Sequence, residues 1–339
     1  MTAAVRTTRL GNGLLAVVRE VRGAPVASFW VFYRVGSRNE VPGITGVSHW
    51  VEHMLFKGTP TWPKGSIFRS ISKVGGTLNA FTWLDWTAYF ATVPSEHLDL
   101  PMRVEADRMV NATFDPAEVE SERTVIIAER EGHENRPTYH LMEELRAAAF
   151  RAHPYGHSVI GWKTDLRSMT RDDLYGHYQR YYTPNNAIAI AVGDVDADAT
   201  LRRIEELFGA IPPRAEPPPV RVVEPPQEAE RRVILRRPSP TGYFDVAYRT
   251  PNAASPDVYP FLLLDAVLSG ADSMAIMGGR DTTMGRSSRL YRALVETGLV
   301  SAVDSGLQLT KDPYLFSISA TLRPETPVEQ VERIVAWVQ

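Results

Sequence analysis

The order of apolar and polar positions in the first part of the chain predicts strands followed by a helix. Residues 13–21 and 25–35 alternate or run apolar, as β-strands do. Residues 45–56 follow helical spacing instead. The apolar stripe of this predicted helix consists of Val47, Trp50, Val51, Met54 and Leu55.

Three more elements follow from the same kind of pattern. Residues 75–93 are rich in β-branched and aromatic side chains and are interrupted at "WLDW", which predicts a β-hairpin. Residues 186–195 predict another strand. A long helix should begin beyond Asp115, because Asp115 suits the N-cap, Pro116 the first helical position and Glu118 a capping box.

A proline-rich stretch and an internal repeat predict the domain organisation. Residues 209–227 read "GAIPPRAEPPPVRVVEPPQ", which is typical of an extended linker. We therefore expect a first domain at 1–212, a linker at 213–227 and a second domain at 228–339. Beyond the linker, "PTGYFDVAYRTP" is similar to the earlier "PVASFWVFYRVG", and "PFLLLDAVLSG" takes the place of "SHWVEHMLFKG".

The second copy differs from the first at three polar positions. When the closing glycines are superposed, the second copy has Phe261, Leu264 and Asp265. The first copy has His49, Glu52 and His53 at these positions. This difference favours one catalytic half and one inactive half. The chain ends inside a predicted helix and the second half is about 100 residues shorter than the first, so we expect a truncated second unit.

Composition removes several classes of site and partner. The 339 residues are 44% hydrophobic and 23% charged, with a net charge of −3, which argues against nucleic acid or an anionic membrane as the main partner. The chain has no cysteine, so a metal would have to be held by histidine and carboxylate groups. No secretion signal or long apolar run is evident, and we expect a cytoplasmic protein.

The polar face of the first predicted helix is the strongest candidate for chemistry. His49 and His53 are four residues apart and can reach one metal ion, while Glu52 on the same face can act on water bound to that ion. The alternative is an ordinary solvated face. This order of residues is rare by composition, whereas a polar helix face is common.

A catalytic zinc site with two histidines needs a third protein ligand, and the helix after Asp115 offers two carboxylates. Glu122 and Glu129 are seven residues apart and share one helix face. The apolar residues on that side are Val119, Val125 and Ile126. A solvated stripe would expose Val125 and Ile126 as well, so we favour a functional role for both carboxylates. His133 is a weaker competing ligand.

The other histidines favour structural roles. His97, His140 and His177 stand singly, and His153 and His157 flank Pro and Gly, which break helical spacing. A di-iron carboxylate protein would need repeated Glu-x-x-His motifs on paired helices, and the predicted strands argue against it.

Together these motifs resemble a known family. "HWVEH" is the inverted zinc motif HxxEH, and the chain resembles the pitrilysin/insulinase metallopeptidases, particularly the branch like mitochondrial processing peptidase. The blocks that carry the resemblance, in family order, are "GSRNEVPGITGVSHWVEHMLFKGT", "GGTLNAFTWLDWTAYFATVP", "ERTVIIAERE", "TPNNAIAIAVGDVD" and "SSRLYRALVETGLVSAV". The resemblance implies an α+β fold with two similar units of mostly antiparallel sheet and flanking helices, closing like a clamshell.

The resemblance also implies a role for each candidate residue. His49, His53 and Glu129 would bind one zinc ion per chain. Glu52 would be the general base of an endopeptidase that hydrolyses extended peptides, and Glu122 would be an additional acidic group that orients the site. Asn79, in "LNAFT", would help to bind the peptide on an edge strand.

One part of the family pattern is missing. Active members complete the site with an arginine and a tyrosine from a second half, and this chain has Val295 and Ser301 near those positions. We therefore expect a homodimer, or a heterodimer with a related chain that supplies the pair. The alternative function is a structural or assembly subunit that cleaves nothing.

Overall fold

The computed structural model describes residues 5–270 and 285–338, which form two compact units. The first unit combines residues up to 130 with residues 157–222, and the second combines 131–156 with the described residues from 223 onward. The segment 131–156 thus belongs with the second unit. The domain ranges proposed from the sequence stay a prediction.

The first unit is built on a six-stranded sheet. Its strands are β1 (Val5–Arg9), β2 (Leu15–Glu20), β3 (Val26–Tyr33), β4 (Thr77–Thr82), β5 (Thr87–Pro94) and β6 (Ala187–Gly193). They lie in the order β1-β2-β6-β3-β5-β4, and every pairing is antiparallel except β2 with β6. The predicted strands and the predicted hairpin are confirmed. Among the described strands, β4 forms one edge of the sheet.

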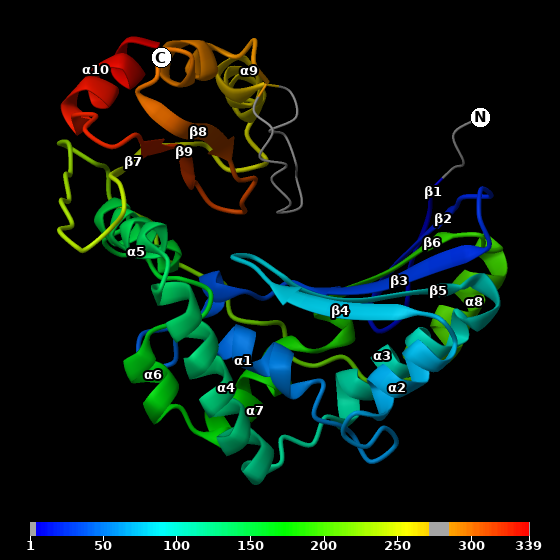
Figure 1. Cartoon of the computed structure of the whole chain (residues 1–339). Helices are drawn as coiled ribbons and strands as arrows, with labels where there is room; N and C mark the ends of the chain where they lie inside the picture. Colours follow the sequence, from blue (N-terminus) through cyan, green and yellow to red (C-terminus); the bar gives the residue numbers. More distant parts are fainter. Residues whose placement is uncertain (1–4, 271–284, 339) are drawn as a thin grey trace. The chain divides into compact units, whose positions relative to one another are not determined.

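Helices cover one face of this sheet, as Figure 1 shows. They are α1 (Val47–Met54), α2 (Ser66–Lys73), α3 (Asp99–Asn111), α4 (Pro116–Glu134), α6 (Lys163–Ser168), α7 (Arg171–Tyr181) and α8 (Ala197–Phe208). The apolar stripe predicted for α1 is confirmed, since all five of its members are at most 1% exposed. Burial of this stripe fixes which face of α1 is turned away from the core.

The predicted beginning of α4 is also confirmed. Asp115 Oδ1 accepts hydrogen bonds from the backbone N–H groups of Ala117 and Glu118, at 2.8 and 3.3 Å, as an N-cap residue does. The Glu118 carboxylate accepts a hydrogen bond from Lys64 Nζ at 2.7 Å. Its predicted part in a capping box stays a prediction.

The other face of the sheet carries aromatic rings on the strands that lead to the β4 edge. Trp30 of β3 stacks on Phe90 of β5, with ring centroids 4.0 Å apart. Phe81 of β4 packs against Trp86 in the hairpin turn, at 4.9 Å. Asn79 is the cross-strand partner of Phe90, so strand alternation places it on this same face.

The second unit has a smaller sheet. Its strands β7 (Tyr243–Arg249), β8 (Val300–Leu307) and β9 (Leu315–Leu322) pair antiparallel in the order β7-β9-β8. The helical elements are α5 (Pro137–Ala149), α9 (Val258–Ser269), η6 (Tyr291–Val295) and α10 (Val328–Val338). Asp265, which replaces the second histidine of the first copy, is 2% exposed and accepts a hydrogen bond from Ser305. Two units of sheet and helices confirm the α+β fold class.

The proline-rich region contains no helix or strand from residue 212 to residue 242. It is nevertheless anchored at one point. The Glu224 carboxylate accepts hydrogen bonds from the backbone N–H groups of Arg151, Ala152 and His153, at 2.7 to 2.9 Å. Part of the predicted linker is therefore fixed to the second unit.

Candidate metal centre

The chain enters α1 through a buried carboxylate. Gly46 is left-handed, with φ 90°, and an added Cβ would lie 2.4 Å from the Ile160 carbonyl oxygen, so only glycine fits. The Glu40 carboxylate accepts the N–H groups of Gly46 and Ser48 at 2.8 and 2.9 Å. N–H groups at the beginning of a helix have no acceptor within the helix. By accepting two of them, Glu40 fixes the beginning of α1 and with it the direction of the polar face.

Two histidines of α1 and one carboxylate of α4 converge on one point. The Nε2 atoms of His49 and His53 lie 3.2 Å apart. Glu129 Oε2 lies 3.8 Å from His49 Nε2 and 3.7 Å from His53 Nε2. A tetrahedral zinc ion with ligand distances of about 2.0–2.1 Å separates its ligand atoms by about 3.3–3.4 Å, so this triangle fits zinc with little adjustment. Two imidazoles and one carboxylate are also a donor set that zinc prefers.

The second carboxylate of α4 orients one of the histidines. Glu122 Oε1 lies 2.8 Å from His53 Nδ1, and its other oxygen is paired with the ammonium of Lys57. Burial acts to raise the pKa of Glu122, but the hydrogen bonds from His53 and Lys57 outweigh it and lower that pKa. An ionised Glu122 places the proton of His53 on Nδ1 and leaves the Nε2 lone pair for a metal. Lys57 cannot be identified from the sequence, because no local pattern marks it.

Glu52 lies between the two histidines in sequence and is almost fully buried. Its exposure is 8%, and Thr82 Oγ1 donates a hydrogen bond to its Oε2 at 2.7 Å. Burial raises the pKa of Glu52 above its ordinary value, although the Thr82 hydrogen bond and nearby His53 oppose this. A carboxylate in such surroundings is a stronger base than one in water. Thr82 was likewise not identified from the sequence.

The carboxylate face of α4 is apolar only in part. Val119 and Ile126 are fully buried, as predicted, but Val125 is 47% exposed, so its predicted burial is wrong. Val125 lies at the border of the stripe, next to Thr124, which is also exposed. Glu122 is 4% exposed and Glu129 is half-buried, which is too little exposure for a solvated stripe.

The remaining histidines do not join this cluster. Among the described residues, His49, His53 and Glu129 are the group of histidine, aspartate and glutamate side chains close enough to hold one ion, and His133 is not part of it. His177 is buried in α7, with its Nε2 atom 3.2 Å from Ser48 Oγ. His153 and His157 flank the short 3₁₀ turn Pro154–Gly156, in agreement with the predicted loop.

The residues at the expected arginine and tyrosine positions supply neither group. Val295 ends η6 and packs against the core of the second unit. Ser301, in β8, is exposed and donates its hydroxyl to the Thr321 carbonyl oxygen at 3.2 Å. Neither side chain can donate a charged or phenolic hydrogen bond to a substrate.

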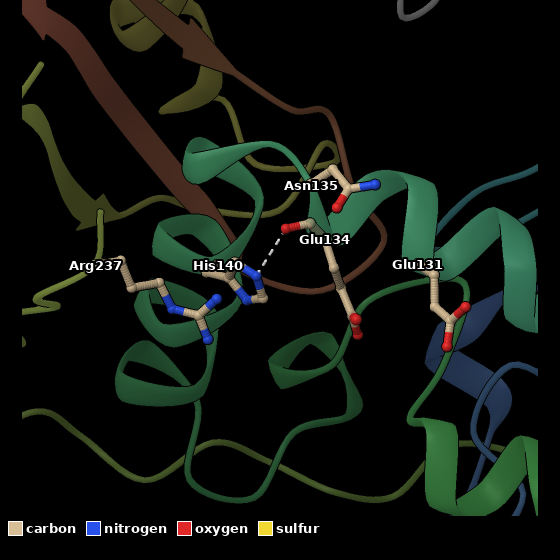
Figure 2. A pocket seen from close by; sticks show the side chains of 5 residues that line it. All are labelled: Glu131, Glu134, Asn135, His140 and Arg237. Carbon is tan, nitrogen blue, oxygen red and sulfur yellow. Dashed lines mark hydrogen bonds between the residues drawn. The ribbon is translucent and has the colours of Figure 1, made fainter. Parts of the chain in front are cut away.

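A separate polar hollow of about 640 Å³ occurs in the second unit (Figure 2). It is lined by Glu131, Glu134, Asn135, His140 and Arg237. His140 Nε2 contacts the Glu134 carbonyl oxygen at 2.9 Å, so the ring is held by the backbone. None of the residues expected to bind zinc lines this hollow.

Comparison with known proteins identifies the family. Residues 16–163 match the sequence profile described as "Insulinase (Peptidase family M16)", and residues 168–339 match the one described as "Peptidase M16 inactive domain". The chain belongs to peptidase family M16. The expected pitrilysin/insulinase resemblance is thereby confirmed.

Relatives of this M16 chain are named as proteases. An uncharacterized zinc protease of Mycobacterium tuberculosis is 32% identical over 325 residues, which are 95% of this chain and 71% of the relative. The beta subunit of the mitochondrial-processing peptidase of Lentinula edodes is 27% identical, over 84% of this chain and 60% of the relative. The zinc in the first name agrees with the donor set of His49, His53 and Glu129.

Solved structures of M16 proteins share the fold. A protease from Helicobacter pylori superposes with a TM-score of 0.92 at 27% identity, covering 99% of this chain and 79% of that one. An M16 inactive domain from Pseudomonas fluorescens, at 20% identity and a TM-score of 0.84, shows the fold alone. Within the described part of this chain, no helix is long and apolar enough to cross a membrane.

Proposed function

We propose that the chain is a zinc-dependent endopeptidase that hydrolyses peptides or unfolded segments bound in extended form. The observation that carries this proposal is the convergence of His49 Nε2, His53 Nε2 and Glu129 Oε2 within 3.2 to 3.8 Å, with Glu52 buried on the same helix face. The names of the M16 relatives support it. The cytoplasmic location of the protein stays a prediction.

Each residue has a defined task in this proposal. His49, His53 and Glu129 hold the ion, which when bound supplies a Lewis acid that polarises the scissile carbonyl and acidifies water. Glu52 accepts the proton of the attacking water and passes it to the leaving amine nitrogen. Glu122, charged and paired with Lys57, keeps His53 in one tautomer through both transfers.

The free edge of β4 provides a place for the substrate. Within the described residues β4 pairs with β5 only, so the outer N–H and C=O groups of β4 can pair with an extended peptide as an added strand. Asn79 is exposed on this strand, and its Oδ1 accepts the N–H of Ala80 at 2.9 Å. Main-chain pairing is nearly independent of the peptide sequence, so selectivity would come from side-chain contacts around the edge.

The proposed active site also needs groups from a partner chain. Val295 and Ser301 offer neither a guanidinium nor a phenol. We propose that a second chain, identical or related, supplies the missing arginine and tyrosine. The mitochondrial-processing peptidase relative is named as a beta subunit, which is the name of one member of an assembly.

A structural or assembly subunit without activity is the second candidate. The match of residues 168–339 to a profile described as an inactive domain favours it. The intact zinc ligands and Glu52 disfavour it, because a chain without catalysis has no use for a buried carboxylate beside a metal site.

Hydrolysis of a mixed library of quenched fluorescent peptides tests the proposal. Wild type and Glu52→Gln are compared with bound zinc measured in both. Cleavage by wild type that disappears in Glu52→Gln at equal zinc content is the expected result. Wild-type chain that carries zinc and cleaves nothing, alone or with a co-purified partner, would favour the structural subunit.

A further inference from the structure

Thr82 holds the proposed base from a different element than the one that carries it. Glu52 lies on α1, whereas Thr82 ends the edge strand β4. The Thr82 hydroxyl donates to Glu52 Oε2 at 2.7 Å, and both residues are less than 10% exposed. A hydrogen bond to an ionised acceptor in a buried place is stronger than one between neutral groups.

The bond assigns different tasks to the two carboxylate oxygens. Glutamate has several rotatable bonds, so a base on this side chain reaches its water only if the carboxylate is held in one orientation. With Oε2 engaged by Thr82, the plane of the carboxylate is fixed and Oε1 is left for water. We propose that Thr82 is a positioning residue for Glu52, an inference that rests on the proposed peptidase function.

Thr82 is itself held by the hairpin. Thr87 begins β5 and is the cross-strand partner of Thr82. Its hydroxyl lies 3.4 Å from Thr82 Oγ1 and donates to the Val35 carbonyl oxygen at 2.9 Å. Thr87 is fully buried, so the support of Glu52 begins in the packed sheet. Groups held by strands keep their geometry better than groups on loops.

The arrangement couples substrate docking to the base. Asn79 and Thr82 lie three residues apart on β4, so their side chains are on opposite faces of the sheet. The backbone between them forms the edge proposed to pair with the peptide. A peptide that pairs with β4 therefore rigidifies the strand that orients Glu52. Thr82 should accordingly affect kcat, while KM reports pairing with the backbone.

Kinetics of the zinc-loaded chain, assayed together with any co-purified partner, test this inference. Thr82→Val keeps the shape and removes the hydroxyl, and it should lower kcat about 10- to 100-fold with KM changed less than about twofold and zinc content unchanged. Thr82→Ser keeps a hydroxyl and should stay within about threefold of wild type. Thr183→Val is the matched control, because it removes a buried hydroxyl that donates to Asn185 Oδ1 at 2.7 Å, and kcat should not change.

Three kinetic results would overturn the inference. The first is a Thr82→Val variant that retains wild-type kcat. The second is a Thr82→Ser variant as slow as Thr82→Val, which would indicate packing and not the hydroxyl. Loss of activity in Thr183→Val as well would mean that any buried hydroxyl is required, and would also overturn it.

A double-mutant cycle tests the contact between Thr82 and Glu52 separately, even if the wild-type chain cleaves nothing. Urea unfolding is measured for wild type, Thr82→Val, Glu52→Leu and the double variant. Thr82→Val should lower the urea midpoint in the wild-type background and change it much less in the Glu52→Leu background, because the acceptor is then absent. Equal shifts in both backgrounds would refute the contact. A wild-type chain that cleaves nothing, together with unequal urea shifts in the two backgrounds, would refute the proposed peptidase function but not the contact between Thr82 and Glu52.

Discussion

Replacement of Glu122 by glutamine should weaken zinc binding without removing a zinc ligand. Glu122 lies 2.8 Å from His53 Nδ1 and is paired with Lys57, and it is 4% exposed. The amide oxygen of glutamine can still accept the proton of His53, but the negative charge is lost, and the amide N–H₂ cannot accept from Lys57. Removing such a partner typically lowers metal affinity about 10- to 100-fold. We expect about tenfold for Glu122→Gln, which corresponds to about 1.4 kcal/mol.

Competition for zinc between the protein and a chromophoric chelator at neutral pH measures this effect. Glu118→Gln is the matched control, since Glu118 lies one turn earlier on α4 and pairs with Lys64, away from the zinc ligands. Its zinc affinity should stay within about twofold of wild type. Wild-type affinity in Glu122→Gln, or an equal loss in Glu118→Gln, would refute the argument that Glu122 acts through His53.

Two further predictions concern stability. Burial, with a smaller effect of Arg180, lowers the pKa of His177 to about 3, below the value of about 6.5 expected in the unfolded chain, so the unfolded state binds the proton first. The free energy of unfolding should therefore fall as pH falls below about 6.5, by about 1.4 kcal/mol at pH 5.5. Chemical unfolding measured across this pH range should show a smaller fall for His177→Gln than for wild type. An equal fall in both proteins would contradict a buried, neutral His177. Asp115→Ala removes the N-cap of α4 and should cost about 1 kcal/mol in urea unfolding, whereas an unchanged midpoint would show that the cap contributes nothing.

The features that the sequence predicts correctly are those that depend on residues close together in the chain. The stripe from Val47 to Leu55 has helical spacing, and its burial turns His49 and His53 to the other face of α1. Asp115 caps α4 because its side chain reaches backbone groups two and three residues ahead. Elements of this kind depend on neighbours in the chain, so a single sequence is sufficient to find them.

The features that the sequence does not predict depend on long-range contacts. Thr82 is 30 residues from Glu52, and Lys57, beyond the end of α1, is paired with a carboxylate on α4, so no spacing rule marks either residue. The position of β6 between β2 and β3, parallel to β2 and antiparallel to β3, also depends on contacts between residues far apart in the sequence. Ideal helix geometry places Val125 on the same side of α4 as Ile126, which predicts burial. It does not give the width of the stripe that other elements cover, and Val125 lies outside that stripe.

The proposed peptidase requires a single zinc centre formed by His49, His53 and Glu129. The decisive measurement is the zinc content of the purified wild type and of Glu129→Ala by plasma mass spectrometry. Circular dichroism checks that the variant is folded. One zinc ion per wild-type chain and a strong loss in the folded variant are the predicted results. Wild-type chain without zinc after reconstitution, or equal zinc in both proteins, would show that these three residues do not form a zinc centre.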